Sequence, residues 1–321
     1  MDQIQPRLNR LEDRREFSES RLRQLAERIK GSSTLVERES LTVIACGSYG
    51  RLEAGEGSDL DLFLVDTGPR RRGRKAEDAR VRAELMAVGR ELGFPEFTRN
   101  GRYLRTHAAR DLVRRLGSRM DDFTNDFTVR LLLLMESRPV HNPAVYTEAL
   151  RQVIAGYYGD YPAHRADFQP AFLQNDLCRY WYTLWVNYEN PRRRPGGSAE
   201  TEALHRLRNL KLKYCRRLTC YSLMAVLGAH PSLSPEELLA WTARTPLERL
   251  EAVAVRQRRR RLFEQVRSQY ARFLDEVHHR DILTRLQDRG YRTAEFERAD
   301  QFSRSASALL EQCVGGKRVP L

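Results

Sequence analysis

Residues 46–65, CGSYGRLEAGEGSDLDLFLV, constrain the fold more than any other part of the 321-residue chain. An apolar, β-branched run at 41–45 leads into this stretch, and the run at 60–65 alternates acidic with apolar residues. Both runs are typical of buried strands. Glycines between them allow backbone conformations that other residues avoid. The stretch therefore predicts a strand, a tight Gly-Ser turn, a loop and a second strand.

The two aspartates of this stretch are spaced so that both side chains would lie on the same face of a strand. Side chains two apart on a strand leave the same face, so we expect Asp59 and Asp61 together and Leu60 and Leu62 in the core. Carboxylates about 7 Å apart repel each other unless a cation lies between them. Mg²⁺ is bound by carboxylates together with substrate phosphate oxygens. The pattern predicts a metal site that holds a triphosphate.

The Gly-Ser turn followed by Asp-Leu-Asp resembles the signature of the DNA polymerase β-like nucleotidyltransferase superfamily. Residues 40–150, including NDFTVRLLLLMESRPVHNPAVYTEAL at 125–150, resemble the nucleotidyltransferase domain of the PII uridylyltransferases. The resemblance implies transfer of a nucleotide with release of pyrophosphate, helped by two Mg²⁺ or Mn²⁺ ions. It implies Asp59 and Asp61 as catalytic metal ligands. It also implies nucleotide binding by Gly47, Ser48, Arg51 and Ser58.

The superfamily usually adds a third carboxylate from a neighbouring strand. We expect that strand within residues 94–106 and choose Glu96 as the third catalytic residue and metal ligand, although the family usually has Asp there. Asp121, Asp122 and Asp126 are alternatives, but MDDFTND is more typical of a helix cap. Without a third acid, the protein would bind nucleotide without transferring it.

After residue 150 the apolar residues follow helical periodicity, and no resemblance to the other uridylyltransferase domains is present. We predict an α+β fold, in which a small mixed β-sheet nucleotidyltransferase core with flanking helices precedes an all-helical domain that closes the cleft. The expected parts are an N-terminal helix at 1–32, a catalytic domain at 33–150 and the helical domain at 151–321. Helices are predicted at 7–30, 76–92, 126–136, 144–157, 170–189, 200–228, 235–243, 246–287 (in one or two pieces) and 293–313.

The helical half offers four further candidates for nucleotide binding. Asn175 and Arg179 lie on a polar stripe of an aromatic-rich helix, and Lys211 and Lys213 follow on a basic helix. Both sets are also compatible with plain solvated faces. The run RQRRRR at 256–261 is either a nucleic-acid footprint or a solvated helix surface that wraps around every side.

The net charge of +13, from 56 Lys and Arg against 43 Asp and Glu, favours polyanionic partners. The five cysteines have no paired spacing, the N-terminus has no apolar segment, and the chain has no long apolar run. These features indicate a cytoplasmic protein with no membrane partner. We expect a template-independent enzyme whose acceptor is an oligonucleotide or nucleic-acid hydroxyl, with a role in anti-phage defence implied by the resemblance. The alternatives are UMP or AMP transfer to a partner protein and a non-catalytic nucleotide-binding protein.

Overall fold

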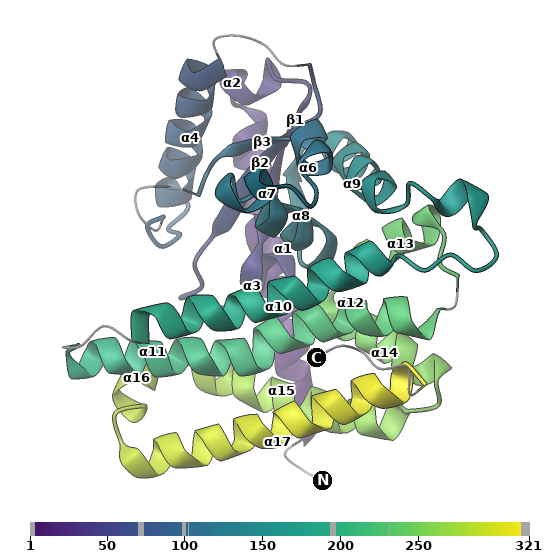
Figure 1. Cartoon of the computed structure of the whole chain (residues 1–321). Helices are drawn as coiled ribbons and strands as arrows, with labels where there is room; N and C mark the ends of the chain where they lie inside the picture. Colours follow the sequence, from purple (N-terminus) through teal and green to yellow (C-terminus); the bar gives the residue numbers. More distant parts are fainter. Residues whose placement is uncertain are drawn as a thin grey trace. The chain divides into compact units, whose positions relative to one another are not determined.

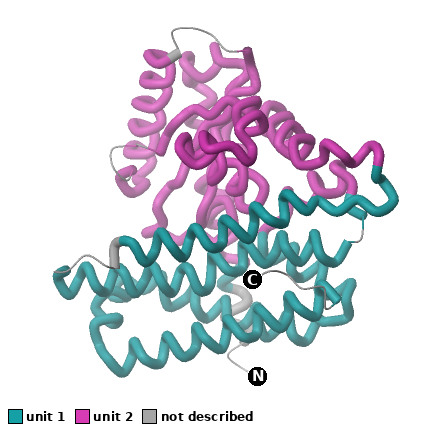
Figure 2. Tube along the Cα trace, in the orientation of Figure 1, with its two compact units in different colours: residues 1–11, 164–233, 246–321 teal, residues 12–163, 234–245 magenta. Residues whose placement is uncertain are grey.

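The computed structural model describes residues 4–69, 74–97, 101, 103–192, 197–230 and 232–315. The chain packs into two compact units, coloured separately in Figure 2. Unit 1 comprises residues 1–11, 164–233 and 246–321, and unit 2 comprises residues 12–163 and 234–245. The units therefore divide the chain at different places from the boundary predicted at residue 150, because residues 151–163 and 234–245 pack with the N-terminal half.

Unit 2 contains a four-stranded mixed sheet in the order β3-β2-β1-β4 (Figure 1). β1 pairs antiparallel with both β2 and β4, whereas β2 pairs parallel with β3. This arrangement agrees with the small mixed sheet predicted from the sequence. The strands are β1 (Leu41–Cys46), β2 (Asp61–Asp66), β3 (Thr106–Ala108) and β4 (Arg138–His141).

β1 and β2 form where the sequence pattern predicts them, β2 beginning one residue later than expected. Every residue of β1 is buried, so both faces of this central strand are covered. The expected third strand is displaced: β3 begins only at Thr106, and residues 94–97 have no regular structure. Residues 98–100 and 102, which belong to that predicted strand, lie outside the described part of the chain.

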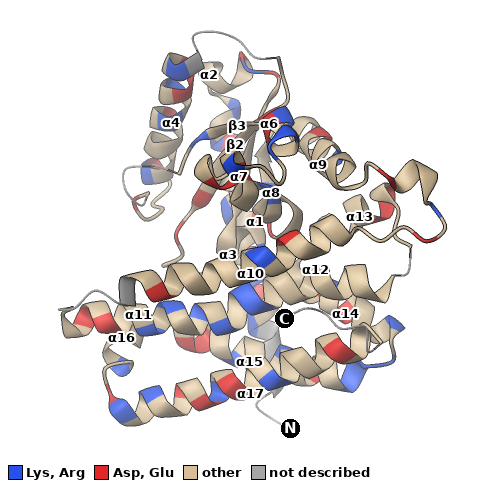
Figure 3. Ribbon diagram, in the orientation of Figure 1, with Lys and Arg blue, Asp and Glu red and all other residues tan. Residues whose placement is uncertain are grey.

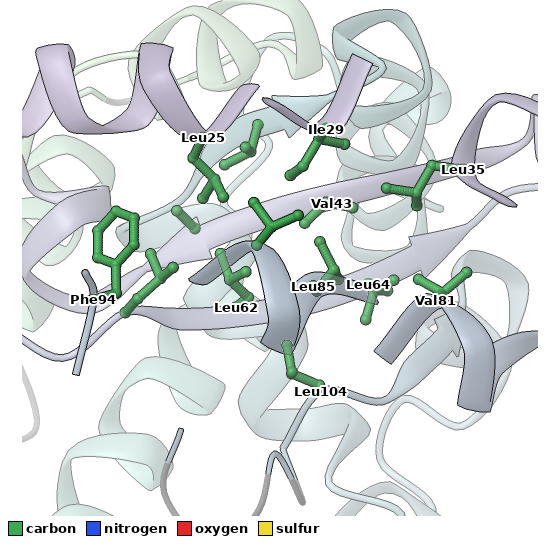
Figure 4. Packing of buried hydrophobic residues seen from close by; sticks show 14 of the residues in the cluster. Leu25, Ile29, Leu35, Val43, Leu62, Leu64, Val81, Leu85, Phe94 and Leu104 are labelled. Carbon is green, nitrogen blue, oxygen red and sulfur yellow. The ribbon is translucent and has the colours of Figure 1, made fainter. Parts of the chain in front are cut away.

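The core of unit 2 forms where α1 (Ile4–Lys30) and α4 (Arg74–Glu91) pack on one face of β1 and β2 (Figure 4). Leu25 and Ile29 of α1 meet alternate side chains of the strands. α9 (Pro143–Tyr157) packs against β1 and β2 as well. Gly93, with φ +71°, ends the α4 segment as expected. The labelled members of the cluster are Leu25, Ile29, Leu35, Val43, Leu62, Leu64, Val81, Leu85, Phe94 and Leu104.

The remaining helices of unit 2 are short except for α8, which matches the buried helix predicted at 126–136. They are α2 (Ser33–Val36), α3 (Gly47–Gly50), α6 (Ala109–Arg114), α7 (Arg119–Phe123), α8 (Asp126–Met135), the 3₁₀ turn η1 (Tyr161–Ala163) and α13 (Pro235–Thr242). α13 begins with a capping box between Ser234 and Glu237 and packs on α9.

The described elements of unit 1 are all helical, in keeping with the periodicity of the sequence. They are α10 (Ala171–Arg192), α11 (Ala199–Lys211), η2 (Leu212–Arg216), α12 (Arg217–Ala229), α14 (Pro246–Arg256), α15 (Arg260–Val277), α16 (Ile282–Arg285) and α17 (Arg289–Cys313). A π-helical turn, η2, joins α11 to α12.

The core of unit 1 is built around one aromatic stack at this π-helical turn. Tyr214 stacks on Phe273 with ring centroids 4.0 Å apart and on Phe302 at 4.4 Å. Its hydroxyl accepts a hydrogen bond from Arg272, which also forms a bidentate pair with buried Glu295. Burial raises the pKa of Tyr214 to about 12, so the phenol stays protonated at neutral pH.

No helix within the described residues is both long and apolar enough to cross a membrane.

Candidate functional site

A left-handed glycine turns the chain at the end of β1. Gly47 has φ +65°, a conformation that glycine adopts without steric cost. Helix α3 begins at this residue, and the amide of Arg51 donates to the Gly47 carbonyl at 3.0 Å. Ser48 is half-buried within the turn. The predicted Gly-Ser turn is therefore present directly after the buried strand.

The β1–β2 ladder brings this turn beside the paired aspartates. A Cβ built on Gly47 would lie 2.7 Å from Oδ2 of Asp61, so any other residue here would make the carboxylate move from this position. Asp59 and Asp61 are exposed, whereas Leu60 and Leu62 are buried in the core. The predicted alternation is confirmed, although Asp59 lies in the loop before β2 and not within the strand.

Contacts of Tyr49 and Gly50 with neighbouring residues hold the turn in place. The ring of Tyr49 meets Phe94 edge-on, with centroids 5.6 Å apart, and the Arg21 guanidinium lies 4.1 Å from the Phe94 centroid. Burial raises the pKa of Tyr49. Gly50 packs on the backbone of Glu136 so closely that a Cβ there would lie 2.0 Å from the carbonyl oxygen. The turn therefore rests on a rigid scaffold.

Arg51 does not face the solvent as a nucleotide ligand would. Its side chain is 7% exposed; Nε donates to Glu53 at 2.7 Å and Nη1 donates to Glu136 at 2.6 Å. Two buried carboxylates thus surround one buried guanidinium, which pairs with both of them. These contacts tie the turn to the end of α8, and nucleotide binding by Arg51 remains a prediction.

Ser58 shapes the loop that leads to the aspartates. Its hydroxyl accepts from the amide of Gly55 at 3.0 Å, and its own amide donates to the Gly55 carbonyl at 2.9 Å. The amide of Ala54 donates to the hydroxyl of Ser18 on α1 at 2.9 Å. Local hydrogen bonds of this kind fix a loop. Nucleotide binding by Ser58 remains a prediction.

Glu96 is exposed and lies in the irregular segment after α4. In the described part of the chain, no three His, Cys, Asp or Glu side chains come together as a group that would hold a metal ion. The structure therefore does not gather Asp59, Asp61 and Glu96 into the three-carboxylate cluster expected from the sequence.

The strand beside β2 does not provide another acid. β3 runs parallel to β2, with Leu64 opposite Thr106, and residues 98–110 contain no Asp or Glu. Two of the alternative acids are buried in other pairs. Asp121 binds Arg130 with both side chains fully buried, and Asp126 lies 2.8 Å from His107 Nδ1.

The expected helix cap in MDDFTND is also absent from the described contacts. The residue before α8, Asn125, has a left-handed backbone and makes no side-chain cap bond. Asp126 in the first turn is held by Arg115 and Thr124 in addition to its histidine partner. Asp122 is exposed on α7. The segment therefore supplies buried ion pairs in place of a cap.

The donor atoms present fit a metal ion that shares its ligands with a substrate. Mg²⁺ keeps several waters and is commonly held by one or two carboxylates plus phosphate oxygens, not by an all-protein cage. Asp59 and Asp61 are two exposed carboxylates next to a glycine turn, which matches that requirement. These two residues would hold the ion, and the phosphates would complete its shell.

The candidates from the helical half belong to unit 1, whereas the turn and aspartates belong to unit 2. Asn175 and Lys211 are exposed on α10 and α11. Arg179 is half-buried, with Nη1 3.6 Å from Asp176 Oδ1. Lys213 lies in η2 and pairs with Asp300 at 2.6 Å. Nucleotide binding by these four residues remains a prediction.

The net positive charge lies almost entirely in one unit; Figure 3 marks the Lys, Arg, Asp and Glu residues in colour. Unit 1 holds 29 Lys and Arg against 17 Asp and Glu, a net charge of +12. Unit 2 holds 27 against 26, a net charge of +1. The net positive charge from which a polyanionic partner was expected is therefore carried by unit 1.

Comparison with family models, with curated proteins and with solved structures finds no match to this chain.

A shallow hollow on unit 2 contains none of the predicted site residues. It is lined by Ser20, Arg23, Gln24, Glu27, Arg28 and Leu92.

Sequence reasoning missed Glu136, which supports the site through both its backbone and its carboxylate. The available signal was an acid placed directly after the apolar run at 131–135, where an unpaired carboxylate would be costly.

Proposed function

We propose that this chain is a metal-dependent, template-independent nucleotidyltransferase that uses a nucleoside triphosphate. The finer architecture belongs to the same proposal: residues of unit 2 act as the catalytic domain and unit 1 covers the substrate. The observation that carries the proposal is the contact of a left-handed Gly47 with the Asp61 carboxylate, with exposed Asp59 two residues before it.

In the reaction, an acceptor hydroxyl oxygen attacks the α-phosphorus of the triphosphate. A new P–O bond forms, the bond to the β-phosphate oxygen breaks, and pyrophosphate leaves with that electron pair. The hydroxyl proton passes to solvent. A bound Mg²⁺ would neutralise phosphate charge. Backbone amides of the Gly47 turn and the Ser48 hydroxyl bind phosphate oxygens, so positioning contributes much of the rate.

The acceptor that the charge distribution favours is an oligonucleotide or nucleic-acid hydroxyl. A unit with a net charge of +12 attracts a polyanionic chain far more than a neutral or acidic protein. Transfer to a protein hydroxyl has no comparable support in the described residues.

The test incubates the purified chain with each α-³²P-labelled NTP and dNTP in the presence of Mg²⁺ or Mn²⁺. We expect a ladder of labelled oligonucleotides on a denaturing gel, lost in D59N and D61N and after chelation. The matched control is D160N, which neutralises an aspartate that is also exposed in unit 2. Because the substituted carboxylates are exposed, all three variants should melt at the wild-type temperature. Near-normal turnover by D59N or D61N would refute the proposal.

A second candidate is a non-catalytic nucleotide-binding protein. The specific observation in its favour is that the strand beside β2 supplies no carboxylate, so a third metal ligand is missing there. The same assay separates the two functions. Nucleotide binding that depends on Gly47 and Ser48, with no incorporated label under any condition, would establish the binding protein. Label fixed to protein would establish protein modification instead.

A further inference from the structure

The arginine-rich run at 256–261 forms the turn between α14 and α15, so the segment at 246–287, predicted as one or two helices, divides at this run. α14 ends at Arg256 and α15 begins at Arg260. Arg258 between them has φ +57°, and the amide of Arg259 donates to the Ala254 carbonyl at 2.7 Å. A left-handed residue with such a bond closes a helix sharply. The five arginines are therefore gathered at one reversal of the chain.

All five side chains of this turn, which we call the arginine turn, are exposed. They are Arg256, Arg258, Arg259, Arg260 and Arg261. Among the residues that the structure describes, none of the five forms an ion pair with a carboxylate. The nearest acid along α15, Glu264, lies 3.5 Å from Arg267 instead. The arginine turn is thus a dense positive patch that the described protein leaves without a counter-charge.

Part of the patch, at the start of α15, lies where positive charge is unfavourable, whereas Arg256 lies in the last turn of α14, where the macrodipole favours a cation. Positive residues at the start of a helix oppose the macrodipole, and the first turn of α15 contains no acid to offset Arg260 and Arg261. The charge of Arg259 also acts on Cys313 at the end of α17. There, burial raises the pKa of Cys313 to about 11, with Arg259 acting against that increase. A bound anion would offset the unfavourable charge of Arg260 and Arg261 at the start of α15.

The chemistry of the patch selects a chain of phosphates. Guanidinium groups bind phosphate in a bidentate fork, and several adjacent forks match the closely repeated charges of a nucleic-acid backbone. A helix that inserts at a membrane surface pairs its basic residues with an apolar face. On the described part of α14 and α15, the one large apolar side chain that is exposed is Val255.

We propose that the arginine turn is the docking site for the phosphate backbone of a single-stranded nucleic-acid acceptor. The identity of the bound strand as the acceptor rests on the proposed function, whereas the docking itself does not. The turn binds the strand without reading its sequence, because arginine–phosphate contacts carry no base information.

The test compares full-length wild type with R260E/R261E for binding to fluorescein-labelled RNA and DNA single strands of about 20 nucleotides. Glutamate at the start of α15 suits the helix dipole, so the variant should melt no lower than wild type. For the strand that wild type binds more tightly, we expect affinity to fall at least about tenfold near 0.1 M salt. The slope of log affinity against log salt should become shallower by about 1.4, for two lost phosphate contacts.

The matched control is R165E/R289E, which changes the net charge of unit 1 equally at two exposed arginines outside the turn. It should bind the strand within about twofold of wild type. Three outcomes would overturn the docking site: no strand binding by wild type, equal weakening in both variants, or unchanged binding by R260E/R261E. Loss of binding to phosphatidylserine vesicles alone would also overturn it and assign the turn to a lipid surface.

D61N separates this inference from the proposed function. We expect D61N to bind the strand as wild type does while failing to incorporate label. Should D61N keep its transferase activity while R260E/R261E loses strand binding, the proposed catalytic site fails and the docking site stands.

Discussion

Gly47 and Asp61 meet across the β1–β2 ladder so closely that a Cβ on the glycine would lie 2.7 Å from Asp61 Oδ2. The glycine also has φ +65°. Two separate constraints therefore act at position 47. Its left-handed backbone disfavours any residue with a side chain, and the Asp61 carboxylate occupies the space that a Cβ would fill. The orientation of the Asp61 carboxylate therefore depends on residue 47 having no side chain.

The first prediction concerns Gly47→Ala. The left-handed backbone should cost about 1–2 kcal/mol of unfolding free energy, measured by urea denaturation. Because the new methyl displaces the Asp61 carboxylate, transferase activity should fall at least about tenfold, beyond what the stability loss explains. Gly47→Asn is the control, since asparagine tolerates the backbone but keeps the Cβ. An asparagine variant with full stability and full activity would show that the contact with Asp61 is unimportant.

The local part of this site could be predicted from the sequence, because it depends on neighbouring residues. Alternation with a period of two is enough to place Leu60 and Leu62 in the core and the aspartates outside. The direction of Arg51 could not be predicted in this way. Its partner Glu136 lies 85 positions along the chain, and only the tertiary fold brings the two together. From the local sequence alone, an arginine that follows a Gly-Ser turn is interpreted as a nucleotide-binding residue, because its distant partner is not visible there.

The second prediction tests the structural role of Arg51. Arg51→Met leaves the carboxylates of Glu53 and Glu136 buried without their cation, so we expect a loss of about 3–5 kcal/mol in unfolding free energy. The control, Arg28→Met, removes a solvent-exposed ion pair with Glu91 and should change stability little. A nucleotide ligand would behave differently: Arg51→Met would then weaken triphosphate binding while the protein melted normally.

The third prediction uses two glycines of the same loop. Gly50→Ala would place a Cβ 2.0 Å from the Glu136 carbonyl oxygen, a backbone atom that cannot turn aside, so we expect a loss of about 3 kcal/mol or more. Gly57→Ala meets open space and should change the unfolding free energy by less than about 0.5 kcal/mol. Equal melting temperatures for the two variants would contradict the packing of α3 on the end of α8.

The arginine turn shows a second limit of sequence reasoning. The run RQRRRR contains neither Gly nor Pro, so no local signal indicates that a helix ends within it. The reversal depends on Arg258 adopting a left-handed backbone, which the packing of α14 against α15 imposes. The strand expected to lie beside β2 is displaced for a related reason: β3 forms later in the chain than expected and carries no acid.

The last prediction concerns acid stability and Asp126. Burial raises the pKa of this carboxyl, but hydrogen bonds from His107, Thr124 and Arg115 outweigh burial and hold the pKa at about 2, below the ordinary value of 3.8. A depressed pKa stabilises the fold at pH values above 3.8, and this stabilisation is lost as the pH falls toward 2. The full contribution is about 2 kcal/mol, of which about 1 kcal/mol should be lost by pH 3.

Urea denaturation of wild type and D126N at pH 5 and at pH 3 measures this contribution. D126N should be less stable than wild type at pH 5, because Arg115 loses one of its two carboxylate partners, and the difference should shrink by about 1 kcal/mol at pH 3. D160N, at an exposed position of unit 2, should follow wild type at both pH values. A constant difference between wild type and D126N from pH 5 to pH 3 would mean that the carboxyl titrates normally and that its three partners do not stabilise its charge.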